Sequence, residues 1–468
     1  MKLFGAMKVK NNELLVGGVS CSHLVREFGS PLYVMDEKLL INTCKDYYDN
    51  FKCKEENNKV AYAGKAFLTK AMCKLVEEQG LYLDVVSGGE LFTAYKAGFP
   101  LNKVYFHGNN KSRGEIELGV KLGVGRFVVD NLSEMKMLNK ESKRYNKIQD
   151  IYLRLTPGIE AHTHEYIKTG QIDSKFGFAP VGETIMEAVK HALDCENLNL
   201  KGLHCHIGSQ IFETEPYEDA VEIMMKFIKE IKEQTGYTIH ELDLGGGFGI
   251  HYTDGDNPKS IKEYCKVILK KVDEVCSNLN VEKPILTIEP GRSIVGNAGI
   301  TLYTIGAIKN IQGVRTYVSV DGGMTDNIRP ALYGAKYEMA IANKMNEKLD
   351  TRVAIAGKCC ESGDVFIDDI CIQNPEIGDI LAVFSTGAYG FSMSSNYNKN
   401  PKAPVIFVKD GIVRVVSKRQ SYEKKRLYLV IRRRMAEKKG ICNEMDSITR
   451  FAGHVAGLGK SSFPACRD

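Results

Sequence analysis

Eight short apolar segments, each followed by a stretch of helical length, constrain the fold of this chain more than any other feature. The segments are VAYA (60–63), YLDVV (82–86), KVYFH (103–107), RFVVD (126–130), IYLRL (151–155), GLHCHI (202–207), HELDL (240–244) and ILTIE (285–289). Amphipathic stretches such as 69–80 and 217–236 lie between them. Repeated strand–helix units predict a parallel sheet, and eight units in roughly 250 residues predict a closed (β/α)8 barrel.

Polar residues recur where these apolar segments end. They are Lys65, Asp84, Ser87, His107, Arg154, His206 and Glu289. Active sites of such barrels lie at the C-terminal ends of the strands. The sequence therefore predicts that these side chains share one end of the barrel.

The pattern changes after Arg292, where strand-like runs recur with glycine-rich turns. The runs are 299–308, 316–323, 352–358, 380–386, 403–411 and 412–418, and KDG (409–411) between the last two is typical of a hairpin. Short strand-like pieces also occur within residues 8–34. We therefore predict a barrel over 35–290 and a discontinuous all-β domain formed by 1–34 and 291–423.

Charge and cysteine content narrow the functional classes. The net charge is +5, but residues 424–468 carry +7 and the rest of the chain −2. The main body thus lacks the basic bias of a nucleic-acid-binding protein, and the last segment is predicted to be a basic extension, either solvated or an interaction tail. The sequence has no apolar run long enough to span a membrane. Thirteen cysteines without metal-type spacing favour the reducing cytoplasm.

Lys65, GGGFG (245–249) and EPGR (289–292) together predict a pyridoxal phosphate enzyme. Alone, Lys65 would be read as a solvated lysine at a strand end. Adjacent glycines let backbone N–H groups approach an anion, and barrels often bind phosphate after strands seven and eight. A carboxylate such as Glu289 beside the ring nitrogen of the cofactor keeps that nitrogen protonated.

HCHIGSQ (204–210) resembles a metal motif because His204 and His206 alternate on one strand. No third ligand follows at the usual zinc spacing, so we predict no metal. His206 is interpreted as an imidazole against the cofactor ring, Ser209 as a hydroxyl near the phosphate, and His204 as a packed core residue.

Three further motifs offer groups for a substrate. GKCCESGD (357–364) is either a turn with buried cysteines or a source of two functional groups. In the second interpretation, Cys360 protonates a carbanion and Glu361 holds an amine. DNIRPALY (326–333) offers Arg329, which suits a carboxylate, and Tyr333. Tyr389 lies in a loop flanked by glycines.

Taken together, these motifs resemble those of the diaminopimelate decarboxylases, which belong to the alanine racemase-like (fold type III) pyridoxal phosphate enzymes. YAGKAF, HGNN, HIGSQ, GGGFG, EPGR, RPALY, CESGD and GAYG follow the order of that family, over about residues 10–423. The resemblance implies that Lys65 carries the cofactor, His206 stacks on its ring and Glu289 pairs with its nitrogen. The implied cofactor-binding residues also include Asp84, Ser209, Gly245, Gly246, Gly247, Pro290, Gly291, Arg292 and Tyr389.

The resemblance further implies the reaction and the assembly. Arg292, Arg329, Tyr333, Glu361 and Tyr389 would contact substrate, and Cys360 would be the proton donor. The active site of this family is completed by a neighbouring subunit that donates the CESGD segment, so a homodimer is expected. The expected reaction is decarboxylation of meso-2,6-diaminopimelate to L-lysine and carbon dioxide. The alternatives are a related decarboxylase of ornithine, arginine or carboxynorspermidine, a racemase, and a non-catalytic binding homologue.

Overall fold

The computed structural model describes residues 1–159 and 173–423. The chain divides into two units, Met1–Gln420 and Ser421–Asp468. The predicted basic extension, residues 424–468, lies outside the described residues, and so does the segment 160–172.

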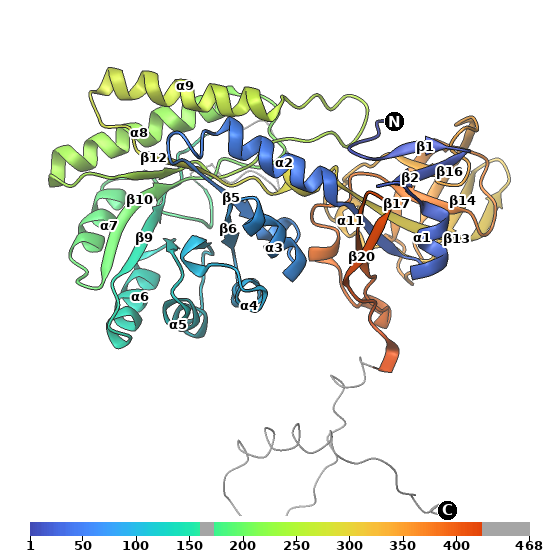
Figure 1. Ribbon diagram of the computed structural model, residues 1–468, viewed down its shortest axis with the longest axis horizontal. Coiled ribbons are helices and arrows are strands. Elements are labelled where there is room, and N and C mark those ends of the chain that lie inside the picture. Colours follow the sequence, from blue (N-terminus) through green and yellow to red (C-terminus); the bar gives the residue numbers. More distant parts are fainter. Residues whose placement is uncertain (160–172, 424–468) are drawn as a thin grey trace, which may run out of the picture. The chain divides into compact units, whose positions relative to one another are not determined.

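A closed barrel of eight parallel strands forms the central part of the sequence of the larger unit (Figure 1). The strands are β5 (Lys59–Ala63), β6 (Tyr82–Val85), β7 (Val104–Phe106), β8 (Arg126–Val129), β9 (Gln149–Arg154), β10 (Leu198–His204), β11 (Glu241–Asp243) and β12 (Ile285–Ile288). Each predicted apolar segment contains or overlaps one of these strands. Pairing of β12 with β5 closes the ring.

Helices outside the barrel connect successive strands and bury one apolar face each. They are α2 (Glu37–Asn50), α3 (Lys70–Glu78), α4 (Gly88–Ala97), α5 (Arg113–Leu122), α6 (Leu132–Arg144), α7 (Thr184–Leu193), α8 (Glu215–Thr235) and α9 (Ile261–Leu279). Short 3-10 turns precede β7 (η2, Leu101–Lys103) and follow β5 (η1, Gly64–Ala66). Because η1 immediately follows a barrel strand, its residues lie at the barrel mouth.

A second, mostly β domain contains both ends of the described chain. Its strands are β1 (Lys8–Lys10), β2 (Glu13–Val16), β3 (Val19–Ser20), β4 (Leu32–Asp36), β13 (Gly299–Ile311), β14 (Arg315–Val320), β15 (Met339–Ile341), β16 (Thr351–Ala356), β17 (Val365–Ile372), β18 (Ile380–Val383), β19 (Val405–Lys409) and β20 (Ile412–Ser417). Its helical segments are α1 (Cys21–Phe28), α10 (Arg292–Val295), α11 (Arg329–Tyr333), η4 (Phe391–Met393) and η5 (Tyr397–Lys399).

The N-terminal strand β4 is central to this domain, because it pairs with β13 on one side and β19 on the other. The predicted fold class, a (β/α)8 barrel with an all-β domain, is confirmed. The boundaries 1–34, 35–290 and 291–423 stay predictions. Strand β17 was missed, because adjacent Asp368 and Asp369 interrupt the alternation that identifies a strand.

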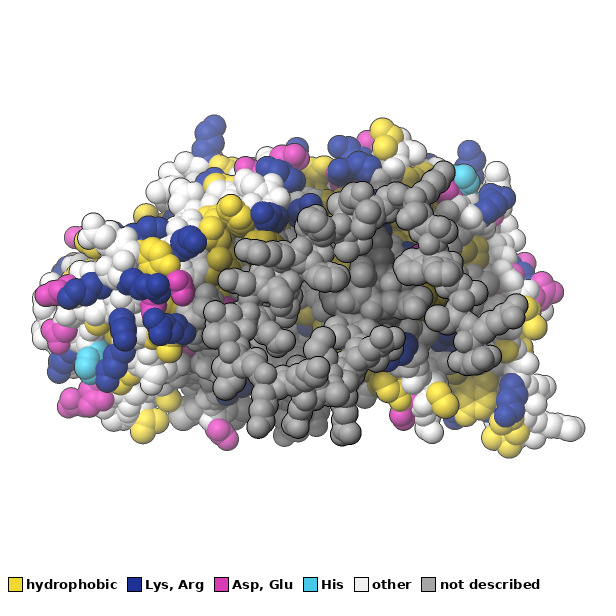
Figure 2. Space-filling model, turned by 90° about the horizontal axis from the view of Figure 1, so that it is seen from below, with side chains coloured by type: hydrophobic (Ala, Val, Ile, Leu, Met, Phe, Trp, Pro, Cys, Tyr) yellow, Lys and Arg dark blue, Asp and Glu magenta, His cyan; other side chains and the backbone are white. Residues whose placement is uncertain are grey.

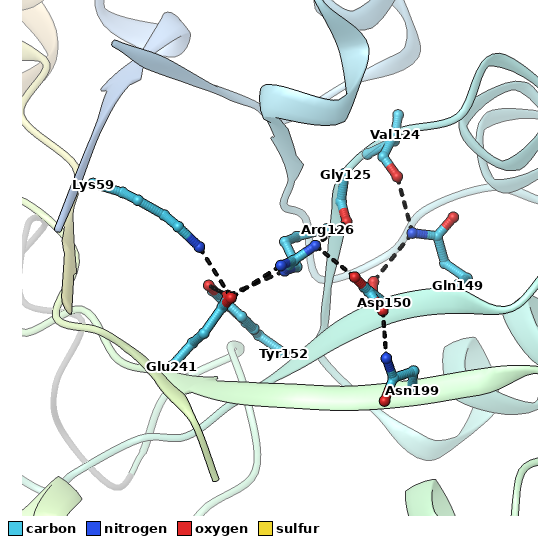
Figure 3. A network of polar contacts seen from close by, with 9 residues as sticks. All are labelled: Lys59, Val124, Gly125, Arg126, Gln149, Asp150, Tyr152, Asn199 and Glu241. Carbon is cyan, nitrogen blue, oxygen red and sulfur yellow. Dashed lines mark hydrogen bonds and ion pairs between the residues drawn. The ribbon is translucent and has the colours of Figure 1, made fainter. Parts of the chain in front are cut away.

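Inward side chains fill the barrel in layers, because alternate residues of a strand point to the same side. Towards the N-terminal ends of the strands, Glu241 accepts hydrogen bonds from Arg126 and Tyr152 and forms an ion pair with Lys59 at 3.0 Å (Figure 3). One step along the strands, Ala61, Tyr105, Val128 and Tyr152 form a small buried cluster. The next inward positions border the cavity described below.

The surface carries charges of both signs. On the visible parts of the face in Figure 2, Lys and Arg side chains lie among Asp and Glu side chains. No helix in the described part of the chain combines the length and apolarity needed to cross a membrane.

We expect Glu241→Gln to destabilise the protein, because it leaves the buried Lys59 without its charge partner and removes one of the two carboxylates that pair with Arg126. Although burial opposes ionisation, Arg126 and Lys59 lower the pKa of Glu241 to about 2. At pH 7 the free energy of unfolding should fall by about 3 kcal/mol. The ionised group contributes stability above its unfolded pKa of about 4.3, and this contribution is lost as pH falls towards 2.

Urea unfolding at several pH values measures the difference in the free energy of unfolding between the wild type and Glu241→Gln. This difference should become smaller below pH 4. Asp369→Asn is the matched control, because its ion pair with Arg352 is exposed. That variant should leave the free energy of unfolding close to the wild-type value, because water screens an exposed ion pair. An equal effect of the two substitutions would contradict the expectation.

Candidate active site

A cavity of about 770 Å³ opens at the C-terminal ends of the barrel strands. The barrel contributes residues that follow most of its strands, and the β domain contributes a second wall. Of the predicted site residues, Lys65, Asp84, His206, Ser209, Gly246, Gly247, Glu289, Gly291, Arg292, Arg329, Tyr333 and Tyr389 border it. Gly245, Pro290, Cys360 and Glu361 are not among its lining residues.

Lys65 borders the cavity from η1, immediately after β5. The turn that presents it is held from the other domain: the carbonyl oxygen of Ala66 accepts hydrogen bonds from Tyr389 N (2.8 Å) and Ser392 Oγ (3.2 Å). Gly64 is needed here because an added Cβ would lie 2.9 Å from Asp84 O. The amine of Lys65 is thus carried by a fixed turn rather than by a free loop.

A buried carboxylate and two histidines lie at the base of the cavity. Glu289 Oε1 lies 2.6 Å from His107 Nε2, and Glu289 Oε2 lies 3.3 Å from His204 Nε2. Burial alone would raise the pKa of Glu289, but His107 and His204 lower it well below its usual value. Glu289 is therefore an ionised carboxylate at neutral pH, able to hold a proton on a facing nitrogen.

Burial shifts the pKa values of the neighbouring ionisable groups in the direction that favours their neutral forms. Burial raises the pKa of Asp84 to about 6, and burial lowers the pKa of His204 to about 3. His204 is consequently a neutral imidazole at neutral pH. Burial, together with the cations of Lys65 and Arg154, also lowers the pKa of His206 well below its usual value. A neutral ring at His206 suits stacking on another aromatic ring.

One side of the cavity is suited to an anion. Arg292 donates to Ser209 Oγ from Nη2 (2.9 Å) and Nε (3.3 Å). Its guanidinium carbon lies 4.9 Å from the centre of the Tyr389 ring. The glycine turn after β11 lies alongside, with positive φ at Gly245 and Gly247. The N–H of Gly246 donates to His206 Nδ1 at 3.3 Å, so this turn also orients the imidazole.

The wall formed by the β domain carries a second arginine. Arg329 is buried and donates from Nη1 to the phenol oxygens of Tyr252 (3.2 Å) and Tyr337. Tyr333, in the same helix α11, is half-buried and also borders the cavity. This wall therefore offers a fixed cation and a phenol to a ligand.

Cys360 and Glu361 are exposed in the turn between β16 and β17. The Asp364 carboxylate fixes this turn by accepting from Met324 N (2.6 Å) and Cys359 N (2.8 Å). Asn398 Oδ1 accepts from Cys360 N at 2.8 Å. A single chain thus does not bring the thiol of Cys360 to its own cavity.

Sequence reasoning assigned no role to several residues that border the cavity. His107, Arg154 and Tyr252 are all buried there, and the guanidinium of Arg154 lies 4.3 Å from the centre of the Phe176 ring. His204, interpreted as a packed core residue, is buried but contacts Glu289. His107 and Arg154 could have been found from their inward position at the end of a strand. Tyr252 could not, because it lies in a loop whose sequence has no regular apolar pattern.

These residues fit pyridoxal phosphate. The buried Glu289 Oε1 lies 2.6 Å from His107 Nε2 without the geometry of a full hydrogen bond, so this oxygen beside the cavity can still accept from a ligand. A half-buried lysine amine, a neutral imidazole and an arginine–serine pair beside a glycine turn surround the same cavity. They match the aldehyde, the ring and the phosphate of the cofactor.

Comparison with known proteins agrees with this fit. Residues 38–296 match the family described as "Pyridoxal-dependent decarboxylase, pyridoxal binding domain". A diaminopimelate decarboxylase of Bacillus subtilis is 49% identical over 414 residues, which cover 88% of this chain and 94% of that protein.

Solved structures agree as well. The diaminopimelate decarboxylase of M. jannaschii has a TM-score of 0.85 at 34% identity, covering 91% of this chain and 98% of that one. The diaminopimelate decarboxylase of Helicobacter pylori, complexed with L-lysine, has a TM-score of 0.79 at 30% identity. The match covers 87% of this chain and 99% of that one. By its sequence, its fold and the residues around its cavity, this chain belongs to the diaminopimelate decarboxylase family of pyridoxal-dependent decarboxylases.

Proposed function

We propose that this protein decarboxylates meso-2,6-diaminopimelate to L-lysine and carbon dioxide. The observation that carries the proposal is one cavity with a lysine and an ionised glutamate from the barrel and a buried arginine, Arg329, from the wall formed by the β domain. The first pair suits the cofactor, and the arginine suits the second carboxylate of this substrate. Family membership supports the same reaction.

Pyridoxal phosphate supplies covalent attachment to an amine and a ring that accepts the electron pair left by a departing carboxylate. Lys65 would hold it through its amine and release it to the substrate amine. Glu289 would keep a proton on the ring nitrogen, which strengthens the electron-accepting character of the ring. His206 would lie against the ring face, and Asp84 would border the same ring.

The phosphate would be held beside α10 and the glycine turn. Arg292 already contacts both Ser209 and Tyr389 there. Gly245, Gly246, Gly247 and Gly291 would let the backbone approach the phosphate, because a side chain at any of these positions would collide with neighbouring atoms, and Pro290 would lie next to Gly291. An added Cβ at Gly246, for example, would lie 2.1 Å from Glu289 O.

The substrate would extend towards the wall of the β domain. Arg329 would bind the carboxylate that is not removed, with Tyr333 beside it and Arg292 and Tyr389 nearer the reacting carbon. A substrate with a single carboxylate, such as ornithine, would leave the buried Arg329 without an anion, at a cost in binding. This argument favours diaminopimelate over the other basic amino acids.

The assembly we propose is a homodimer with shared active sites. Cys360 of the partner subunit would protonate the α carbon, and Glu361 of the partner subunit would bind the distal ammonium. The exposure of both residues in a fixed turn supports this arrangement. We also propose a cytoplasmic location, supported by cysteines that are all free among the described residues.

The direct test is release of carbon dioxide and formation of L-lysine from meso-diaminopimelate, with pyridoxal phosphate added. Ornithine, arginine and carboxynorspermidine serve as competing substrates. We expect diaminopimelate to be preferred by a wide margin in kcat/KM. Preference for ornithine would overturn the proposed substrate.

Lys65→Ala should reduce carbon dioxide release by several orders of magnitude, because the amine that carries and releases the cofactor is lost. Lys70→Ala, at an exposed position five residues further along, is the matched control and should keep wild-type activity. Borohydride reduction followed by peptide mass analysis should place the pyridoxyl group on residue 65. A pyridoxyl group on another lysine would contradict this role.

Arg329→Gln should raise the KM for diaminopimelate by about 10-fold to 100-fold, because a charge-assisted hydrogen bond is lost. The kcat should change much less, since this group binds the carboxylate that does not react. Steady-state kinetics with diaminopimelate and ornithine measure the effect. A loss of kcat at unchanged KM would place Arg329 at the reacting carboxylate instead.

Mixing two inactive variants tests the shared site. Lys65→Ala and Cys360→Ala, unfolded together and refolded at equal amounts, should recover about a quarter of wild-type activity. Half of the random dimers are mixed, and each mixed dimer has one intact site of two. Each variant refolded alone is the control, and no recovery in the mixture would argue that each site uses residues of one chain.

A further inference from the structure

One phenol lies between the two arginines of the cavity. Tyr252 Oη accepts a hydrogen bond from Arg292 Nη1 at 2.6 Å and another from Arg329 Nη1 at 3.2 Å. All three side chains are less than a tenth exposed. Tyr252 comes from the loop between β11 and α9 of the barrel, whereas Arg329 comes from α11 of the β domain.

The two arginines otherwise have different partners. Arg292 bonds Ser209 on the side of the predicted phosphate, and Arg329 bonds Tyr337, which is buried in the core of the β domain. A continuous series of hydrogen bonds therefore runs from Ser209 through Tyr252 to Tyr337. Tyr252 and Tyr337 also meet edge to face, with ring centres 5.4 Å apart.

Two guanidinium groups this close repel each other in a buried site, where charges are poorly screened. The phenol oxygen between them has two lone pairs and can accept one hydrogen bond from each. Both cations lower the pKa of Tyr252 below its usual value although burial would raise it. The oxygen thus stabilises both charges and sets the distance between them.

We propose that Tyr252 is a positioning residue that couples the cofactor-phosphate arginine, Arg292, to the substrate-carboxylate arginine, Arg329. This inference rests on the proposed function. By fixing the two cations relative to each other, Tyr252 sets the length of a substrate that can engage Arg329 while the cofactor is held by Arg292. It thereby contributes to selection of a dicarboxylate of the length of diaminopimelate.

The test compares two substitutions that each remove one hydroxyl. Tyr252→Phe removes the acceptor shared by both arginines, and Tyr337→Phe removes an acceptor of Arg329 alone. Tyr252→Phe should raise the dissociation constant of pyridoxal phosphate and the KM for diaminopimelate, each by about 10-fold or more, with a small change in kcat. Tyr337→Phe should raise only the KM.

Cofactor affinity is measured on cofactor-free protein by absorbance titration with pyridoxal phosphate, without turnover. This measurement stands even if diaminopimelate is not the substrate, so failure of the proposed function and failure of this inference are distinguishable. Wild-type cofactor affinity in Tyr252→Phe, or equal cofactor affinity in the two variants, would overturn the coupling. Melting temperatures establish that both variants are folded.

A third variant guards against a general packing effect. Tyr252→His keeps a ring and an acceptor nitrogen, so its dissociation constant for pyridoxal phosphate should lie between those of Tyr252→Phe and the wild type. A value no lower than that of Tyr252→Phe would show that an acceptor at this position does not matter and would overturn the proposal.

Discussion

The two-residue period of the barrel strands is the constraint on which the rest of the structure depends. In β9, Asp150, Tyr152 and Arg154 point inward in turn, so one strand contributes an ion pair, a core aromatic ring and a residue of the cavity. In β11, Glu241 and Asp243 also point inward: Glu241 forms an ion pair with Lys59, and Asp243 Oδ1 accepts a hydrogen bond from Gly245 N. A slip of one residue would exchange these side chains for those that pack against the helices. Register therefore determines the core and the active site together.

The same layering explains how so many ionisable groups lie inside one barrel. Two buried carboxylates close together cannot both be ionised at low cost. Burial and the neighbouring Glu289 raise the pKa of Asp243 well above its usual value, so Asp243 keeps its proton while the two histidines hold Glu289 ionised. The carboxylate that remains charged is the one at the edge of the cavity, where a cofactor nitrogen can meet it.

The residues that could be predicted from the sequence lie next to regular structure. Lys65 and Glu289 each follow an apolar strand, and in a parallel barrel the ends of the strands share one face. Tyr252 could not be found in this way, because its loop has no period and its partner Arg329 lies 77 residues further along the chain. Strand β17 was obscured by Asp368 and Asp369, which face solvent at a sheet edge and pair with arginines. The spacing of apolar residues along the sequence reveals which face of a strand or helix is buried. It does not reveal the contacts that loop residues make.

The β domain does more than border the cavity, because it fixes the turn that carries Lys65. Tyr389 has a positive φ of 62°, an uncommon conformation for a residue with a side chain. In that conformation its N–H reaches Ala66 O while its ring lies under the guanidinium of Arg292. Gly387 makes the approach possible, since an added Cβ there would lie 1.8 Å from Val295 O. The barrel alone therefore contains Lys65 but not the contacts that hold its turn, and a functional site requires both domains to fold together.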